Sequence, residues 1–398
     1  MKQRRIVIAG AGVAGCLIAS GLADRPDLEV IILERSPVGA QLDVGTGLNI
    51  GPNALKVLAE ILPERANAVR RESLPWHNWQ VGLTDGRILM DLDLADVADN
   101  PGVRIRWSSL YALLRAPISD CIRFGVEVVG VNRTATGIHV ETIEAATGVR
   151  RRIDDVDLII AGDGRYSDVR RTLCGEDPPD FFGVALFRML LSVNSDCPIN
   201  DYGQWFNGPN RLLAFRVPGD LVYCAGSFPI GHDAQVTDQM KSRKVLAALY
   251  RPKDQPLSDQ AKFLVDALLR PDCDLHWARL QDGPIRHDGG PGVVFVGDAA
   301  HPILPTLGQG ATQAIEDACE LIDELRHSLT TGDDLCGLPR RFAVRRDERA
   351  QFVRQFSRDA TDTMLRNSDP IAGTALKQKV DFTSRLQTLY RYAPEWIT

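Results

Sequence analysis

The segment IVIAGAGVAG, residues 6–15, constrains the fold of this chain more than any other stretch. Its apolar start predicts a buried strand, and Gly10, Gly12 and Gly15 form the pattern G-x-G-x-x-G where a helix should begin. Glycines at this spacing allow a tight turn and a close approach to a pyrophosphate, which the helix N-terminus stabilises. A second apolar strand, 29–33, ends at Glu34, about 20 residues further on, where a ribose-binding acid is expected. The segment therefore predicts a parallel β-α-β unit that binds a dinucleotide.

Composition limits the class of protein. The chain has 398 residues, 44% of them apolar and 25% charged, which is typical of a globular enzyme large enough for two domains. A net charge of -6 argues against a nucleic-acid partner, because affinity for phosphate backbones needs an excess of Lys and Arg. Acidic residues interrupt the basic stretch 340–349, so this stretch predicts a solvated helix face.

The cysteines and the hydropathy pattern indicate a cytoplasmic protein. The eight cysteines show no C-x-x-C pair and no grouping typical of metal ligands, so we expect reduced thiols and no metal site. No stretch approaches the roughly 18 apolar residues of a membrane span, and the N-terminus runs directly into the first strand. We expect no membrane partner, and a monomer or a homodimer.

The order of predicted elements indicates an α/β fold with an insertion. Strand-like runs separated by Asn, Gly and Pro fill 181–275 and predict a mostly antiparallel sheet, and the α/β pattern returns at 293. Helices are expected at 107–123, after Asn53 as the N-cap, and through most of the chain beyond 311. We expect a discontinuous nucleotide-binding domain formed by 1–75, 101–180 and 276–340. The substrate-binding sheet domain should consist of 76–100 and 181–275, and a C-terminal helical segment of 341–398.

Two more segments place Gly-Asp or Asp-Gly pairs directly after strands: LIIAGDGRYSDVR (158–170) and VVFVGDAAHPILPTLGQG (293–310). Together with GAGVAG (10–15), they resemble the three FAD fingerprints of the group A flavoprotein monooxygenases, single-component aromatic hydroxylases similar to p-hydroxybenzoate hydroxylase. The resemblance covers nearly the full length. It implies a Rossmann-like FAD-binding domain of the GR2 type, an inserted antiparallel β-sheet substrate domain and C-terminal helices.

The resemblance also assigns residues to FAD. Asp298 is implied to bind ribityl or ribose hydroxyls, and the helix after Gly310 to point its positive end at the flavin ring. Asp163 is implied to serve FAD and a transiently bound NADH or NADPH. The full set implied to bind FAD is Gly10, Gly12, Val13, Ala14, Gly15, Glu34, Arg35, Arg106, Trp107, Val131, Asp163, Asp298, Pro305, Gly308, Gln309, Gly310 and Ala311.

Two positions depart from the family pattern. Trp107 stands three residues before Leu110, where the family usually has an Arg that contacts FAD. Either Arg106 takes that role from a shifted register, or Trp107 packs against the cofactor. Thr312 replaces the usual Asn after Gly-Gln-Gly, which removes one side-chain amide near the flavin.

The family chemistry implies an enzyme that consumes NADH or NADPH and O₂. The reduced flavin adds O₂ to give a C4a-hydroperoxide, which transfers oxygen to an electron-rich ring. The carbonyl of Pro305 is expected to accept a hydrogen bond from the ring hydroxyl. His301 is the nearest titratable side chain in sequence, although in this family it more often shapes the loop than moves protons.

For the substrate we look to arginines inside the apolar strands of the inserted sheet. An Arg buried there needs an anionic partner, which a substrate carboxylate would provide. The candidates are Arg188, Arg211, Arg216 and Tyr223. The alternative is that these side chains point out of a two-faced sheet. The expected substrate is a small hydroxypyridine or aromatic acid. The competing functions are a reductase or halogenase of the same fold, although the halogenase signature W-x-W-x-I-P is absent, and a non-catalytic FAD-binding protein.

Overall fold

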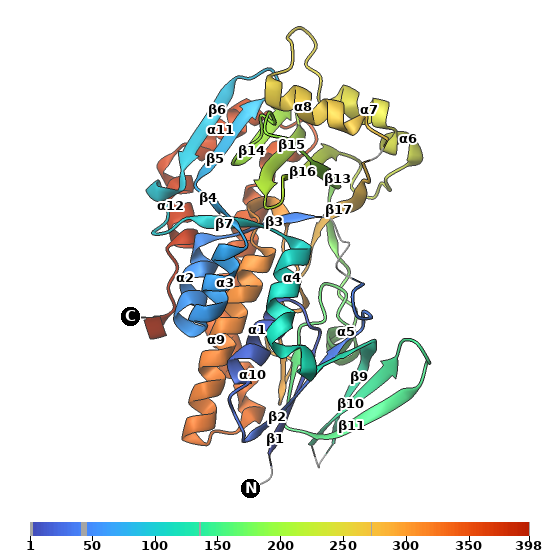
Figure 1. Cartoon of the computed structure of the whole chain (residues 1–398), viewed down its shortest axis with the longest axis vertical. Helices are drawn as coiled ribbons and strands as arrows, with labels where there is room; N and C mark the ends of the chain where they lie inside the picture. The colour runs from blue at the N-terminus through green and yellow to red at the C-terminus, as the bar shows by residue number, and fades with distance from the viewer. Residues whose placement is uncertain (1–2, 41–45, 135–136, 272, 398) are drawn as a thin grey trace.

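A computed structural model describes residues 3–40, 46–134, 137–271 and 273–397. A five-stranded parallel sheet organises the lower half of the molecule as drawn in Figure 1. Its strands, in spatial order, are β18 (Val293–Phe295), β12 (Leu158–Ala161), β1 (Arg4–Ala9), β2 (Leu28–Glu34) and β8 (Ile122–Phe124). β1 lies in the middle, where its apolar run is buried on both faces, as expected for a parallel strand. The β-α-β unit predicted from the glycine motif is confirmed.

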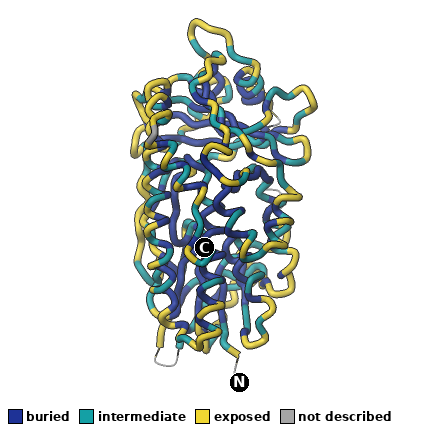
Figure 2. Tube along the Cα trace, turned by 90° about the vertical axis from the view of Figure 1, so that its left-hand side faces the viewer, coloured by how far each residue is buried: buried dark blue, intermediate teal, exposed yellow. Residues whose placement is uncertain are grey.

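Different layers cover the two faces of this sheet. On one face α1 (Val13–Leu22) and α9 (Gly310–Thr331) pack against Ile6 and Ile8. The opposite face, which contains Val7, packs against a three-stranded antiparallel sheet and the short helix α5 (Asp168–Cys174). That small sheet consists of β9 (Val126–Thr134), β10 (Gly137–Glu144) and β11 (Arg150–Val156). The buried backbone therefore runs through the middle of the molecule (Figure 2).

A seven-stranded sheet forms the upper half in Figure 1. Its order is β17 (His276–Asp282), β13 (Asp180–Ser192), β16 (Leu221–Pro229), β15 (Asn210–Val217), β14 (Tyr202–Asn207), β5 (Asn78–Leu83) and β6 (Ile88–Asp93). The β14–β5 pair is parallel, and the other neighbours are antiparallel. β17 extends this sheet to residue 282, beyond the limit of 275 expected for the inserted segment.

Helices cover both faces of the seven-stranded sheet. One face packs against the helices between β16 and β17, which are α6 (Asp238–Lys241), α7 (Arg243–Leu249) and α8 (Asp259–Leu268). The other face packs against the C-terminal helices and the loop that contains Leu304. These helices are α10 (Leu338–Asp359), α11 (Pro370–Lys377) and α12 (Val380–Tyr390).

A short antiparallel sheet joins the two halves. It has the order β3 (Gly47–Ile50), β7 (Gly102–Arg106) and β4 (Leu74–Trp76). Along the chain, α2 (Pro52–Ile61) and α3 (Pro63–Arg71) connect β3 to β4, and α4 (Trp107–Arg115) follows β7. The expected N-cap role of Asn53 is wrong. The cap lies two residues earlier, at Gly51, and α2 begins at Pro52, because proline favours the first helical position. The helix expected over 107–123 ends at Arg115 and continues as a 3₁₀ turn.

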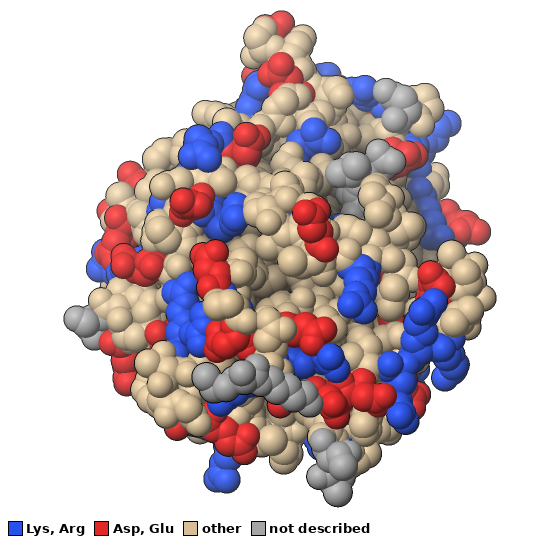
Figure 3. Space-filling view, turned by 60° about the horizontal axis from the view of Figure 1, so that its bottom comes forward, with Lys and Arg blue, Asp and Glu red and all other residues tan. Residues whose placement is uncertain are grey.

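Charged side chains of both signs are interspersed over the face shown in Figure 3. Within the described residues, no helix combines the length and the apolar character needed to cross a membrane.

A buried ion network fixes α9 against α10. Arg346 is fully buried and donates hydrogen bonds from Nε to Asp317 (2.8 Å), from one terminal nitrogen to Glu316 (2.9 Å) and from the other to Gln313 (2.9 Å). The two carboxylates raise the pKa of Arg346 even though burial opposes its charge. All three partners lie on α9, so one guanidinium holds the helix that begins at the end of the Pro305 loop.

We expect Arg346→Met to destabilise the protein by about 3–5 kcal/mol, because it removes the guanidinium that pairs with the buried carboxylates of Glu316 and Asp317, and only Glu316 keeps a second arginine, Arg349. The midpoint of urea unfolding measures the loss. Arg340→Met is the matched control, since Arg340 is exposed on the same helix and should change stability by no more than about 0.5 kcal/mol. Equal midpoints for the two variants would contradict the role of the network.

Candidate active site

The glycine turn between β1 and α1 brings three strand ends together. Gly10 has φ +94°, a conformation that favours glycine, and its N–H donates to the Leu33 carbonyl at the end of β2 (2.7 Å). A Cβ at Gly10 would overlap the carbonyl of Gly162, which follows β12. The turn leads directly into the N-terminus of α1. Gly10 and Gly12 of the turn, together with Glu34, line a cavity of about 190 Å³.

Glu34 is buried at the end of β2 and braces this turn. Its carboxylate accepts hydrogen bonds from the N–H groups of Ala11 (2.9 Å) and Ser36 (3.0 Å). Arg115 lies 3.4 Å from the same carboxylate and donates two hydrogen bonds to the Ala11 carbonyl. Arg35 lies beside Glu34 on the cavity wall, with its side chain largely exposed.

A column of side chains on α4 continues along the cofactor region. Trp107 and Tyr111 contact each other edge to face, with centroids 4.7 Å apart, and the Arg115 guanidinium lies 4.6 Å from the Tyr111 ring centroid. Trp107 lines a second cavity of about 290 Å³, whereas Arg106 lines neither that cavity nor the 190 Å³ one. The structure thus places Trp107, of the two alternatives, toward the cofactor region. The sequence analysis missed Tyr111 and Arg115, although they follow Trp107 at successive intervals of four residues, which puts all three on one helix face.

Asp163 follows β12 and lies on the wall of the smaller cavity. One carboxylate oxygen accepts from the Val169 N–H (3.2 Å), and the other is buried without a hydrogen-bond partner among the described residues. Burial raises the pKa of this carboxyl. An unpartnered acceptor of this kind fits a ligand hydroxyl. Val131 lines none of the cavities described here: its side chain lies in the core opposite Val140, and Val126–Val128 forms the wall instead.

The 290 Å³ cavity lies where the Gly-Asp turn, the proline loop and the start of α9 meet. Asp298, Pro305, Gly308, Gly310 and Ala311 all line it. The first turn of α9 carries backbone N–H groups without helical partners, so this end of the cavity favours negative charge. The Pro305 carbonyl accepts from the Gly308 N–H (3.1 Å), which leaves its second lone pair available to a ligand.

The side chain of Gln309 turns into the protein. It is buried, and its carbonyl oxygen accepts hydrogen bonds from Asn53 (3.3 Å) and Gln313 (3.2 Å). Thr312, which replaces the usual Asn, accepts from the Gly51 N–H (2.9 Å). Gln309 and Thr312 therefore fasten α9 to the start of α2, and neither lines the cavity.

His301 is also directed inward. Its Nε2 lies 2.7 Å from Asp317, which accepts the Gly297 N–H (2.7 Å) as well and lies 3.5 Å from His287. Burial alone would raise the pKa of Asp317, but His301, Arg346 and His287 hold it well below its usual range. His301 does not line the cavity. Its Nε2 and the Gly297 N–H contact the same oxygen of Asp317, so its position is that of a residue that shapes the loop, the role expected more often than proton transfer. The two histidines and Asp317 are close enough to hold a metal ion, but the Arg346 cation already pairs with this carboxylate.

The inner face of the seven-stranded sheet forms the opposite wall of the 290 Å³ cavity. Arg188, Arg211 and Tyr223 line it, as expected. Arg216 does not, because it lies on the other face of β15 and donates hydrogen bonds to the carbonyls of Ile199 (2.8 Å) and Cys197 (3.2 Å). The expected role of Arg216 in substrate binding is therefore not supported by its position.

Arg211 is a buried cation without an anion. Its side chain is 5% exposed, and within the described residues it forms neither an ion pair nor a hydrogen bond. Burial lowers the pKa of Arg211, and burial raises the pKa of Tyr223 to about 12. Aromatic rings complete this wall, with Phe215 stacked on Tyr202 at 5.7 Å and tilted against Tyr223 at 4.9 Å.

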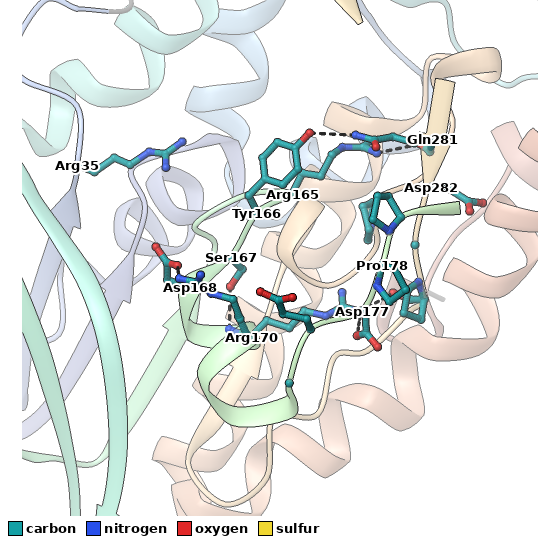
Figure 4. A pocket seen from close by; sticks show the side chains of 17 residues that line it. Arg35, Arg165, Tyr166, Ser167, Asp168, Arg170, Asp177, Pro178, Gln281 and Asp282 are labelled. Carbon is teal, nitrogen blue, oxygen red and sulfur yellow. Dashed lines mark hydrogen bonds and ion pairs between the residues drawn. The ribbon is translucent and has the colours of Figure 1, made fainter. Parts of the chain in front are cut away.

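A third cavity, an open groove of about 800 Å³, adjoins the other two (Figure 4). It shares Arg35, Tyr166 and Asp168 with the 190 Å³ cavity and Arg165 with the 290 Å³ cavity. Gln281 donates to the hydroxyl of the exposed Tyr166 (3.0 Å) and accepts from Arg165 through its backbone carbonyl (2.8 Å). The same four side chains therefore form part of the wall of the groove and part of the wall of an inner cavity.

These features fit FAD. The glycine turn leaves room for a pyrophosphate, Glu34 and the unpartnered oxygen of Asp163 offer acceptors for hydroxyl groups, and α9 points its positive end into the second cavity. Eleven of the seventeen residues that we expected to contact FAD line the two inner cavities. Val13, Ala14 and Gly15 follow the glycine turn as the buried start of α1, and Arg106, Val131 and Gln309 lie away from both cavities.

Alanine substitutions at Gly10 and Gly12 should have different effects, one on the stability of the apoprotein and the other on its affinity for FAD. Gly10→Ala should destabilise the apoprotein by about 2 kcal/mol or more, because of its φ and its overlap with Gly162. Gly12→Ala meets its nearest atom at 3.9 Å, so we expect unchanged apoprotein stability but roughly tenfold weaker FAD binding, since the methyl group takes pyrophosphate space. Thermal melting and FAD titration measure the two effects. Unimpaired FAD binding by the Gly12 variant would contradict this position for the pyrophosphate.

Comparisons with known proteins agree with this site. A family model described as an FAD binding domain matches residues 285–387. The chain is 24% identical to 6-hydroxynicotinate 3-monooxygenase of Pseudomonas fluorescens, over 93% of this chain and 94% of that protein. It is 26% identical to 3-amino-4-hydroxybenzoate 2-monooxygenase PtnB3 of Streptomyces platensis, over 81% and 79%.

The fold resembles that of solved proteins that bind FAD. The structure of HpxO from Klebsiella pneumoniae, complexed with FAD and uric acid, superposes with a TM-score of 0.77 at 19% identity, over 97% of this chain and 92% of that one. The chain therefore contains a segment that matches an FAD binding domain, is similar over most of its length to the aromatic monooxygenases named above, and shares its fold with a solved protein that binds FAD.

Proposed function

We propose that this enzyme hydroxylates a small aromatic or N-heteroaromatic ring that carries an acidic group, using FAD, O₂ and NADH or NADPH. The observation that carries the proposal is Arg211, a cation buried on the wall of the 290 Å³ cavity without an anionic partner among the described residues. A buried, unpaired charge is costly, and a bound carboxylate would remove that cost. Arg188 lies on the same wall and adds to the positive field.

The remaining lining suits a ring of this size. Leu186 and Leu213 give apolar surface, and Phe215 gives an aromatic one. Tyr223 keeps its proton at neutral pH, because burial raises its pKa to about 12, so it can donate a hydrogen bond but does not act as a base there. The relatives named for 6-hydroxynicotinate and 3-amino-4-hydroxybenzoate act, by their names, on aromatic carboxylates, which supports the proposal.

The residues of this chain divide the remaining tasks. Bound FAD would supply the redox chemistry: a hydride taken from NADH or NADPH, and insertion of one oxygen atom of O₂ into the ring with the other released as water. Arg211 would hold the acidic group, and the Pro305 carbonyl would accept the hydrogen of a ring hydroxyl, which raises electron density in the ring. The first turn of α9 would stabilise negative charge on the cofactor. The apolar wall would keep water from the reacting atoms.

The 800 Å³ groove gives the nicotinamide cofactor a route to the flavin. Arg165 lies on the wall of the groove and of the inner cavity, and its Nε is 3.9 Å from Asp298. The proposed enzyme works in the cytoplasm as a monomer or homodimer. Its domains follow the division expected from the sequence, with the substrate domain extended to residue 282 because β17 belongs to its sheet.

Arg211→Met should separate acidic from neutral ligands. We expect binding of an acidic ring such as 6-hydroxynicotinate to weaken by about 30- to 1,000-fold, the range for truncating a buried charge partner. Binding of 2-hydroxypyridine, the same ring without the carboxylate, should change little. Titration of the flavin absorbance measures both.

Arg216→Met is the matched control, because Arg216 lies on the opposite face of the same strand. Equal losses for the acid and the neutral ring would contradict the role of Arg211. Incorporation of oxygen from ¹⁸O₂ into the product distinguishes a hydroxylase from a reductase, which would consume NADH or NADPH without it.

Tyr223→Phe should lower affinity without changing the pH dependence. Losing one hydrogen-bond donor should weaken ring binding by about fivefold to thirtyfold. The pH-rate profile between about pH 6 and pH 9 should keep its shape, since a phenol with a pKa of about 12 does not ionise in that range. A displaced profile would show instead that Tyr223 takes part in the proton transfer.

A further inference from the structure

A second, small cavity shares Arg211 with the 290 Å³ cavity. Its volume is about 20 Å³, and it is enclosed between the inner face of the seven-stranded sheet and the C-terminal helices. Arg211 forms part of the wall of both this cavity and the 290 Å³ one. Polar groups in the wall come from Trp79, Gln204, Arg211, Thr306, Thr363, Thr374 and Lys377.

The wall offers hydrogen-bond donors and positive charge. The Nε of Arg211 and the indole Nε1 of Trp79 are buried without a partner among the described residues, and the two side chains are 5% and 7% exposed. Such unpaired donors cost about 1–3 kcal/mol each. Lys377 adds a second cation, although its ammonium group already donates to the Ala360 carbonyl (3.2 Å) and lies 2.8 Å from Asp362. None of the residues lining this cavity is an Asp or Glu.

Size and charge restrict the occupant. A cavity of about 10–15 Å³ holds one water molecule, so this one admits a monatomic ion and excludes an aromatic ring, a phosphate or a sulfate. A water molecule would satisfy the two donors but would leave the charge of Arg211 uncompensated. Burial lowers the pKa of Lys377, and repulsion from Arg211 lowers it further, which an anion between them would relieve.

We propose that this cavity binds a single monatomic anion, chloride under ordinary conditions, which neutralises Arg211 when no acidic substrate is bound. The anion would accept hydrogen bonds from Trp79 and Arg211 in the 20 Å³ cavity, while a substrate would reach the same guanidinium from the 290 Å³ cavity. Because both anions share one cation, each should weaken the binding of the other. This last consequence rests on the proposed substrate class; the anion site itself does not.

The test is thermal melting of the FAD-loaded enzyme in sodium chloride, sodium bromide or sodium gluconate at constant ionic strength. We expect chloride and bromide, but not gluconate, to raise the melting temperature in a saturable way by about 2 °C. The rise should be lost in Arg211→Met and in Trp79→Phe, which removes the indole N–H. It should persist in Lys379→Met, the control, because Lys379 is exposed and lies outside the cavity wall.

Crystals soaked in bromide keep the proposal testable if a variant fails to fold. An anomalous peak between Trp79 and Arg211, together with the saturable rise, would support it. Equal melting temperatures in all three salts would overturn it, as would a peak without any stabilisation, which marks an adventitious ion only.

Substrate titrations separate this inference from the proposed function. We expect chloride to weaken binding of 6-hydroxynicotinate several-fold and to leave 2-hydroxypyridine unaffected. If Arg211→Met loses the acid but chloride has no effect on melting or binding, the anion site is wrong and the proposed function stands. If chloride binds as expected but the enzyme shows no preference for acidic rings, the anion site stands and the proposed substrate class is wrong.

Discussion

The carboxylate of Asp317 is the interaction on which the cofactor side of the molecule depends. It lies fully buried on α9, accepts the backbone N–H of Gly297, and pairs with His301 and Arg346. A buried anion is stable only if all its partners stay in place. The turn before Asp298, α9 and α10 each contribute groups to this network, so moving any one of them would destabilise the carboxylate. The position of the Gly297-Asp298 turn is therefore set by buried contacts with α9.

The same physics explains the contrast with Arg211. Around Asp317 the charges are balanced by the protein itself, and the result is rigidity. At Arg211 the protein supplies the burial but no counter-charge among the described residues, so the free energy of the site depends on what enters from solution. The two sites therefore differ: the carboxylate of Asp317 is paired within the protein, whereas the guanidinium of Arg211 has no anionic partner among the described residues.

Local patterns made the nucleotide-binding half predictable. The strand, glycine turn and helix around Gly10 follow from short-range sterics and hydrophobic runs, and the structure agrees closely with them. The orientations of His301 and Gln309 were not predictable, because their partners, Asp317 and Asn53, come from other elements that only the fold brings near.

One error could have been avoided from the sequence. Arg211 and Arg216 are separated by an odd number of positions on one strand, so they point to opposite faces of the sheet and cannot both line one cavity. The choice between Arg106 and Trp107 has the same character, since adjacent residues at a strand-to-helix junction diverge. Which member of each pair faces the cavity still required the fold.

The parallel pairing of β5 with β14 has a consequence for how the chain becomes a protein. β5 and β6 are synthesised more than a hundred residues before the strand that joins them to the large sheet, and in between the chain completes β12 of the other sheet. During synthesis the first hairpin must therefore remain unpaired at one edge until β14 emerges. Dividing the chain at one position would therefore separate β5 and β6 from the rest of their sheet. A chimeric protein that takes the seven-stranded sheet from a relative must take this hairpin from the same relative.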